Sequence, residues 1–364
     1  MTWRAVRTVA VLELRQRVRS TRWRIMLALW AVVLVALCGG LTALFMLFSP
    51  YPTFTEATPV LYDLIVCFVM GIGLAVAPAL SATSINGDRA DATLALLQAT
   101  ALRSGEIVVG KAVAACVAAL AFLGVALPFL VGLTAFGGSS WAALAGHVLT
   151  LVVVMGSVCA VGLGISATTA RPSASTVLTY LAVTALVIGL PIAMTVSMVA
   201  VQDTQHVTSY ARDYSGDEEG ESPVCETYDY DQTIIRTERI WWITAPQPFV
   251  VLSDISVRAP SPELLRERDD HTSFGAFSPL ASYGWSLDEA RTPQPTSVVH
   301  GSCQADGTEG DVLTTDDEWD GADHPPFWPV SLALTAGVGA LWLVAATRRL
   351  RTPAGKLARG TRIA

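Results

Sequence analysis

Long uncharged, apolar stretches alternate with short charged segments along the whole chain. The intervals without a charged side chain are 25–55, 64–87, 112–170, 172–202 and 324–347. A helix needs about 20 predominantly apolar residues to cross the roughly 30 Å hydrocarbon core of a bilayer. The pattern therefore predicts an all-α polytopic membrane protein.

Helix breakers divide these stretches into six spans. Two prolines in the sequence SPYP end the first span. The interval after Lys111 is more than twice the length of one span, and the sequence FGGSSW (136–141) divides it with a Gly- and Ser-rich turn. The predicted spans are 24–48, 60–82, 107–135, 142–167, 176–201 and 326–347.

An amphipathic helix is predicted over residues 1–23, before the first span. Apolar residues at helical spacing alternate there with arginines; they are Trp3, Val6, Val9, Ala10, Leu14 and Val18. Such a segment lies in the headgroup layer of the membrane. The alternative is a plain positive-inside topology signal with no folded helix. Glu13, an acid among seven arginines, either pairs locally or contacts another subunit.

Composition supports a membrane protein and sets aside a soluble enzyme, a nucleic-acid-binding protein and a disordered chain. Hydrophobic residues make up 52% and charged residues 15%, with a mean hydropathy of +0.48. Soluble domains carry about 25% charged residues.

The net charge of −7 divides into segments of opposite sign. Residues 203–323 hold 25 of the 31 acidic residues and seven of the 24 basic ones, a net charge of −18. The other 17 basic residues lie in segments that six spans place on one side. The positive-inside rule makes that side, and both termini, cytoplasmic. With only two lysines and one asparagine, the composition indicates a GC-rich bacterial genome, hence a bacterial plasma membrane.

The charge partition predicts five regions. The outward segment is too long for a simple connection, and it contains enough aromatic residues for a small mixed domain or for contact with the membrane surface. The regions are an interfacial helix (1–23), spans one to five with a cytoplasmic loop at 83–106 (24–201), an acidic extracellular domain (202–325), span six (326–347) and a basic cytoplasmic tail (348–364).

Within the extracellular domain, residues 233–244 are compatible with a strand pair. Residues 239–255 are equally compatible with a short re-entrant element in the outer leaflet. Cys225 and Cys303 are the two cysteines that face outward, and in an oxidising compartment they predict one disulfide. Two free thiols are the alternative. The histidines and carboxylates of this region have no zinc or calcium spacing, so no metal site is predicted.

The loop between spans two and three contains the sequence GEIVVGK (105–111), which matches a phosphate-binding loop through its lysine. Ala112 stands where the Ser or Thr hydroxyl should be, and an apolar helix rather than a strand–loop–helix unit surrounds it. Nucleotide binding by this chain is therefore not expected.

The same loop resembles that of type-2 ABC transporter permeases, the exporter class. The matching positions are Asp88, Arg89, Thr93, Leu94, Leu96, Leu97, Thr100, Leu102, Glu106, Gly110 and Lys111. The chain departs from the family pattern at Ala92 for Gly, Ala95 for Glu and Ala101 for Pro. The amphipathic first helix, the six spans and the cytoplasmic termini also fit this family.

The resemblance implies a permease subunit that works with a separate ABC ATPase subunit, which binds ATP and Mg, and with a second identical or related permease. No catalytic residue and no cofactor is expected on this chain. The loop would dock on the ATPase through Asp88, Arg89, Thr100 and Glu106. Spans two and five would line the path, with Phe68, Met70 and Met194 as gate candidates or as simple packing residues. The cargo would be hydrophobic or amphipathic: a drug, lipid or peptide.

The rival interpretation is a membrane-anchored sensor or assembly protein whose extracellular domain binds a ligand without transport. The permease-like loop favours the transporter.

Overall fold

The computed structural model describes residues 2–48, 54–90, 102–213, 224–262, 277–301 and 324–350. The chain is mostly helical, and six helices in these residues are long and apolar enough to cross a membrane. They are Thr21–Phe48, Ala57–Ala90, Ser104–Ala135, Trp141–Thr168, Pro172–Val201 and Trp328–Leu350. The six predicted spans are therefore confirmed as helices, as expected of a polytopic membrane protein.

The chain forms two compact units. The first comprises Met1–Gly189, Ala245–Gly284 and Pro326–Ala364, and the second comprises Leu190–Thr244 and Trp285–Pro325. The helices of the first unit are α1 (Trp3–Arg19), α2 (Thr21–Phe48), α3 (Phe54–Ser81), α4 (Asn86–Ala90), α6 (Ser104–Ala135), α7 (Trp141–Thr168), α8 (Pro172–Thr184), the π-helical turn η1 (Ala185–Gly189), α10 (Pro248–Arg258), the first half of α12 (Pro279–Glu289) and α13 (Trp328–Leu350).

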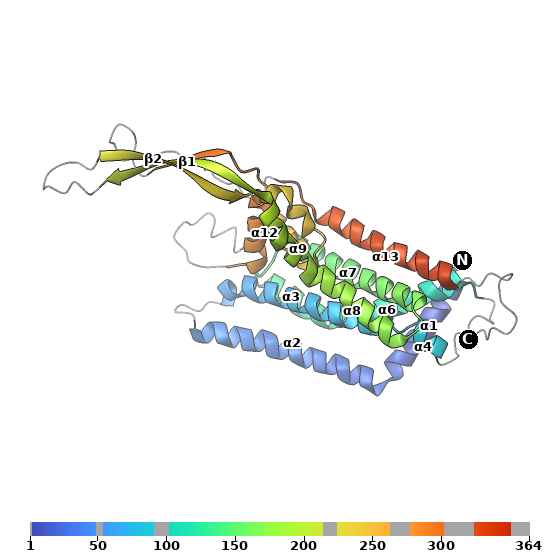
Figure 1. Ribbon diagram of the computed structural model, residues 1–364. Helices are drawn as coiled ribbons and strands as arrows, with labels where there is room; N and C mark the ends of the chain where they lie inside the picture. Colours follow the sequence, from blue (N-terminus) through green and yellow to red (C-terminus); the bar gives the residue numbers. More distant parts are fainter. Residues whose placement is uncertain are drawn as a thin grey trace. The chain divides into compact units, whose positions relative to one another are not determined.

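Three helices form the centre of the first unit. α3, α6 and α7 pack on one another, and α13 packs along α7 (Figure 1). By contrast, α2 and the fifth span (Pro172–Val201), which begins with α8, leave most of their apolar side chains exposed. α2 is held by Trp30, whose indole N–H donates to the Phe122 carbonyl at 3.0 Å and whose ring stacks on Phe68 at 5.5 Å. The exposed apolar faces are those that a bilayer or a second subunit would cover.

The turn between α6 and α7 lies where FGGSSW predicts it. Gly137 adopts φ 92°, a left-handed conformation that favours glycine. Ser140 then caps α7 by accepting a hydrogen bond from the Ala143 N–H at 3.1 Å. A turn and a cap in five residues convert one uncharged stretch into two antiparallel spans.

The fifth span contains a π-helical turn in the middle. α8 runs into η1, which is followed by α9 (Leu190–Met198) and the 3-10 turn η2 (Val199–Val201). Pro191 lies directly after η1; it has no N–H to donate, and its ring interferes with the preceding turn. The proline accounts for the irregular hydrogen bonding at this point.

The second unit contains a three-stranded sheet with the strand order β2-β1-β3. β1 (Gln202–Asp213) pairs antiparallel with β2 (Val224–Ile235), and β3 (Ser297–Gly301) pairs parallel with β1. Figure 1 shows β1 and β2 as a long ribbon. A strand pair over 233–244 is not formed, because β2 ends at Ile235 and is followed by the 3-10 turns η3 (Thr237–Arg239) and η4 (Trp241–Ile243).

The base of this sheet is fixed by a buried arginine. Arg236 pairs with Asp203 at 3.1 Å and with Glu238 at 3.8 Å, and its guanidinium also donates to the carbonyl of Gln294. Beside it in sequence, Trp241 carries the guanidinium of Arg291 over its ring, 4.6 Å from the centroid. These contacts join the start of β1 and the residues after β2 to the segment that precedes β3.

The segment that was also compatible with a re-entrant element ends in the short helix α10 (Pro248–Arg258). Its apolar side chains are buried, with Leu252 fully enclosed, and it packs against α7, α13 and α3. A re-entrant element in the outer leaflet stays a prediction; the structure shows a short helix packed among α3, α7 and α13.

Candidate functional site

The candidate site lies where the first unit gathers its basic residues, around the connection between α3 and α6. α3 ends at Ser81, and a tight turn leads into α4. The backbone N–H groups of Ile85 and Asn86 both donate to the hydroxyl of Ser166 at 3.1 Å, near the end of α7. Ser175 of α8 donates to the Ala82 carbonyl at 2.6 Å. The turn is therefore fixed to two other spans.

The amphipathic helix α1 packs on the beginning of α6. Gly110 leaves the space for this approach: a Cβ there would lie 2.7 Å from Cβ of Val9 and 3.1 Å from the carbonyl oxygen of Val6. Val6, Val9 and Ala10 are buried, whereas Trp3 is 73% exposed. The predicted helix is confirmed, but its apolar face is divided between the protein and the surroundings.

A buried ion-pair cluster joins α1, α4 and α6. The ammonium of Lys111, with a side chain only 1% exposed, lies 2.5 Å from a Glu13 carboxylate oxygen and 2.7 Å from one of Asp88. A buried lysine is costly unless its charge is neutralised and its N–H groups are bonded. The two carboxylates do both, and Glu13 pairs within the chain with a residue 98 positions away, not with a neighbouring arginine of the first helix.

The N-terminus of α6 is capped by the carboxylate of Glu106. The helix begins at Ser104, and Arg103 occupies the cap position. Glu106 reaches back and accepts from the Arg103 N–H at 3.0 Å. Glu106 also accepts from the N–H and hydroxyl of Thr2 at 2.5 and 3.1 Å. The beginning of α1 is thereby tied to the beginning of α6.

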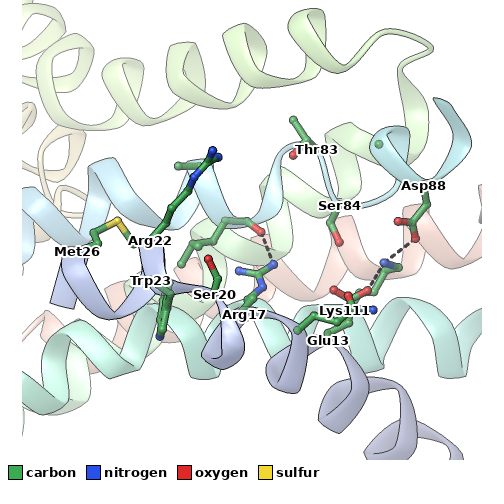
Figure 2. A pocket seen from close by; sticks show the side chains of 14 residues that line it. Glu13, Arg17, Ser20, Arg22, Trp23, Met26, Thr83, Ser84, Asp88 and Lys111 are labelled. Carbon is green, nitrogen blue, oxygen red and sulfur yellow. Dashed lines mark hydrogen bonds and ion pairs between the residues drawn. The ribbon is translucent and has the colours of Figure 1, made fainter. Parts of the chain in front are cut away.

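A cavity of about 560 Å³ opens beside the ion-pair cluster (Figure 2). Its wall includes Lys111, Glu13 and Asp88 on one side and Trp23 and Met26 of α2 on the other. Helices that are distant in the sequence, among them α1, α2 and α6, therefore meet around one cavity.

The loop residues predicted to contact an ATPase have different places. Asp88 is bound to Lys111, Glu106 caps α6, and the guanidinium of Arg89 donates to the Thr169 carbonyl at 3.4 Å. Thr100 lies outside the described residues. Asp88, Arg89 and Glu106 therefore hold the loop and its flanking helices in place within the chain.

The phosphate-loop match at 105–111 is helical over its whole length, within α6. A phosphate-binding loop needs a non-helical turn whose N–H groups surround the ligand. The structure thus agrees with the exclusion of nucleotide binding at this segment.

The gate candidates lie in two helices. Phe68 stacks on Trp30, and Met70, fully buried, belongs to the core formed by α3, α6 and α7. Met194 is a buried residue of α9 in the second unit. Phe68 and Met70 have packing roles here, and a role in a transport path stays a prediction.

At the opposite end of the first unit, two carboxylates cap the N-termini of helices that are far from them in the sequence. Asp63 of α3 accepts from the Ser278 hydroxyl at 2.5 Å and the Leu280 N–H at 3.0 Å, at the beginning of α12. Asp254 of α10 accepts from the N–H groups of Phe327 and Trp328, both at 3.0 Å, at the beginning of α13.

His147 lies near the same end but is fully buried, not at the interface as its position in the fourth span suggested. Its Nδ1 accepts from the Tyr62 hydroxyl at 2.9 Å and its Nε2 donates to the Leu252 carbonyl at 3.0 Å. The histidine therefore joins α3, α7 and α10. Its burial is possible because the Leu252 carbonyl in α10 gives the second ring nitrogen a hydrogen-bond partner.

Sequence reasoning missed Thr2, Gly110 and the pairing of Glu13 with Lys111. A signal for the pairing exists: Glu13 is the one acid of the basic first helix, and Lys111 begins a long uncharged stretch. Each isolated charge needs a partner of opposite sign near apolar surroundings. No comparable signal marks Thr2 as a ligand of Glu106.

The disulfide prediction falls outside the described part of the chain, since Cys303 is not described. β2 carries Cys225 opposite Arg212 of β1, whereas β3 lies on the other side of β1 and ends at Gly301. The four cysteines in the spans are free: Cys38, Cys67, Cys116 and Cys159. Among the described residues, no group of three or more His, Cys, Asp or Glu side chains is arranged to hold a metal ion.

No protein-family model matches the chain, and a search of curated proteins finds no match.

Proposed function

We propose that this chain is the membrane-spanning subunit of an ATP-driven exporter of the type-2 ABC class. It would act with a separate ATPase subunit and a second permease subunit. Both termini would be cytoplasmic and the acidic segment 202–325 extracellular. The cargo would be a hydrophobic or amphipathic molecule. The permease-like motif from Asp88 to Lys111 is the origin of this proposal.

The observation that carries it is the attachment of the loop to the spans. Lys111 binds Asp88 of the loop and Glu13 of α1 simultaneously. Glu106, at the end of the loop, binds Thr2 of the same α1. A force applied to the loop by a docked ATPase would reach α1 and α6 through buried, charge-assisted contacts. An ordinary solvated loop does not need such connections.

The positions of the charged residues in the spans favour a cargo that is uncharged or amphipathic. Asp63 and Lys111 lie near span ends and are each bonded inside the protein. Coupling to protons or sodium requires an ionisable residue near the middle of the membrane. An external energy source, such as a partner ATPase, fits this pattern better.

Association with an ATPase is the direct test. The chain would be produced together with candidate ABC ATPase subunits from the same genome and purified through a tag. Arg103 is exposed, next to the loop, and Arg348 is exposed at the end of α13. Arg103→Glu should reduce ATPase recovery several-fold, whereas Arg348→Glu, the matched charge reversal, should not. Unlike Glu106, whose carboxylate caps α6 and binds Thr2, both side chains are exposed, so the charge reversals are compatible with the fold.

A sensor or assembly protein is the alternative outcome. Absence of any associated ATPase, or equal recovery with Arg103→Glu and with the unaltered chain, would contradict the transporter. The proposed disulfide is tested separately by mass analysis of a proteolytic digest with and without reductant. A linked peptide pair containing Cys225 and Cys303 is expected only without reductant.

A further inference from the structure

The cavity at the junction of α1 and α2 has a cationic part that is not used within the protein. Lys111 contributes no free cationic charge there, because Glu13 and Asp88 both bind it and the three side chains together carry a net charge of −1. Arg17 and Arg22, which also line the cavity, bring the net charge of its lining to +1. Their two guanidinium groups, neither of which forms an ion pair with another described residue, are an attractive site for an anion.

The two arginines differ in how they are held. Arg17 is half-buried, and one of its guanidinium nitrogens donates to the Leu80 carbonyl at 3.0 Å. This bond fixes the group on the cavity wall and leaves its other N–H groups available. Arg22 is exposed and has no ion pair or hydrogen bond with another described residue. Ser20, between them, adds a hydroxyl to the same wall.

The other part of the cavity is apolar. Trp23 and Met26 lie on the next turn of α2, and Leu80 and Ala79 line the facing end of α3. Trp23 is fixed by an edge-on contact with Phe122, at 5.6 Å between ring centroids. Met26 is 39% exposed. Figure 2 shows Trp23 and Met26 grouped away from the Glu13–Lys111–Asp88 cluster, with Arg17 between the two groups.

The position of this cavity along the chain matches the boundary between water and hydrocarbon. Arg24 is the last charged residue before an uncharged interval that continues to Glu56. Arg17 and Arg22 precede this boundary, whereas Met26 follows it. A ligand that fills both parts needs an anionic group and an attached apolar chain, and it must be present at the membrane surface.

We propose that the cavity binds an anionic phospholipid, with its phosphate between Arg17 and Arg22 and the beginning of an acyl chain against Trp23 and Met26. Basic pockets between membrane helices have the chemistry to hold such headgroups. The bound lipid would connect the α1–α2 junction to the end of α3. This inference does not depend on association with an ATPase.

Binding can be measured on the full chain in nanodiscs or by native mass spectrometry. The probes are phosphatidylglycerol, phosphatidylcholine and glycerol phosphate, the headgroup without acyl chains. We expect phosphatidylglycerol to be retained, phosphatidylcholine to bind at least tenfold more weakly, and glycerol phosphate to bind weakest. Equal retention of the anionic and zwitterionic lipids would overturn the proposal. Equal binding of glycerol phosphate and phosphatidylglycerol would reassign the site to free phosphate compounds.

A pair of double variants separates this site from general attraction to a basic segment. Arg17→Gln with Arg22→Gln should weaken phosphatidylglycerol binding about twenty-five-fold, at about fivefold for each arginine. Arg19→Gln with Arg24→Gln removes the same charge from exposed positions that do not line the cavity. Equal loss in both double variants would overturn the proposal. Thermal unfolding in phosphatidylcholine checks that both variants are folded.

Discussion

Gly110 of α6 lies directly against Val9 of α1, with no space for a side chain between them. The close approach makes α1 a packed part of the first unit and brings Glu13, one turn further along α1, within reach of Lys111. A helix that only rested on the membrane would not need a glycine beneath it.

Gly110→Ala should therefore loosen α1. The new Cβ would lie 2.7 Å from Cβ of Val9, and overpacking of this kind costs about 1–3 kcal/mol. We expect trypsin to cleave at the arginines of α1 at least fivefold faster in the variant. Gly124→Ala in the same helix has no neighbour within 4 Å and is the control. An unchanged cleavage rate in Gly110→Ala would show that α1 is not packed as described.

Lys111→Met should destabilise the first unit. Removal of the ammonium leaves the carboxylates of Glu13 and Asp88 facing each other without a cation, and breaking a buried ion pair in this way costs about 3–5 kcal/mol. Thermal unfolding in detergent measures the loss.

The triple variant Lys111→Met, Glu13→Gln, Asp88→Asn separates charge from packing. It removes the unpaired charges, so we expect it to recover a large part of the stability lost in Lys111→Met. A triple variant no more stable than the single one would contradict an electrostatic origin of the effect.

The spans were predictable because their signal is local. Uncharged length, the turn around Gly137 and the arginine-rich first segment each depend on neighbouring residues, and the structure has helices in the uncharged stretches and the first segment and a turn at Gly137. The pairing of Glu13 with Lys111 was not predicted, because it depends on how α1 crosses α6, and that crossing depends on the space left by Gly110. The same holds for His147: its sequence neighbours indicate a span end, whereas its burial depends on α10, about 100 residues later.

The end of strand β2 in the second unit could not be predicted from the local sequence either. Weak alternation in residues 233–244 was compatible with a strand pair, but β2 ends at Ile235, and two 3-10 turns follow. Arg236, buried with Asp203 and Glu238, ends the strand by bringing the chain back to the base of the sheet. A partner 33 residues earlier in the sequence decides this boundary.

Asp254→Asn should weaken the attachment of α13. The carboxylate accepts two N–H groups at the start of that helix, and hydrogen bonds to a charged group contribute about 1.5–3 kcal/mol each at most. Both N–H groups bond the same carboxylate oxygen, and a neutral amide oxygen accepts them more weakly than a charged one, so we expect a lower unfolding temperature in detergent. Glu289→Gln, at an exposed position of α12, is the matched control. Equal unfolding temperatures for both variants would count against the capping role.

His206 provides a pH-dependent prediction in the second unit. Its Nδ1 lies 2.9 Å from a carboxylate oxygen of Asp231, directly opposite on β2, and Nε2 lies 3.8 Å from Asp229. The hydrogen bond to Asp231, together with the charges of both carboxylates, raises the pKa of His206 above its ordinary value of 6.5. NMR titration of the histidine ring should show this, with His206→Gln identifying the signal.

The consequence for stability follows from the direction of that shift. Because the folded pKa is higher than the unfolded one, the folded sheet holds the proton more tightly. The stabilising contribution is therefore complete below about pH 6.5 and is lost as the pH rises through the folded pKa. Asp231→Asn should return the pKa of His206 toward 6.5 and remove this pH dependence, whereas Asp203→Asn, at the base of the same sheet, should leave it in place. A His206 pKa unaffected by Asp231→Asn would mean that the cross-strand pair does not form in solution.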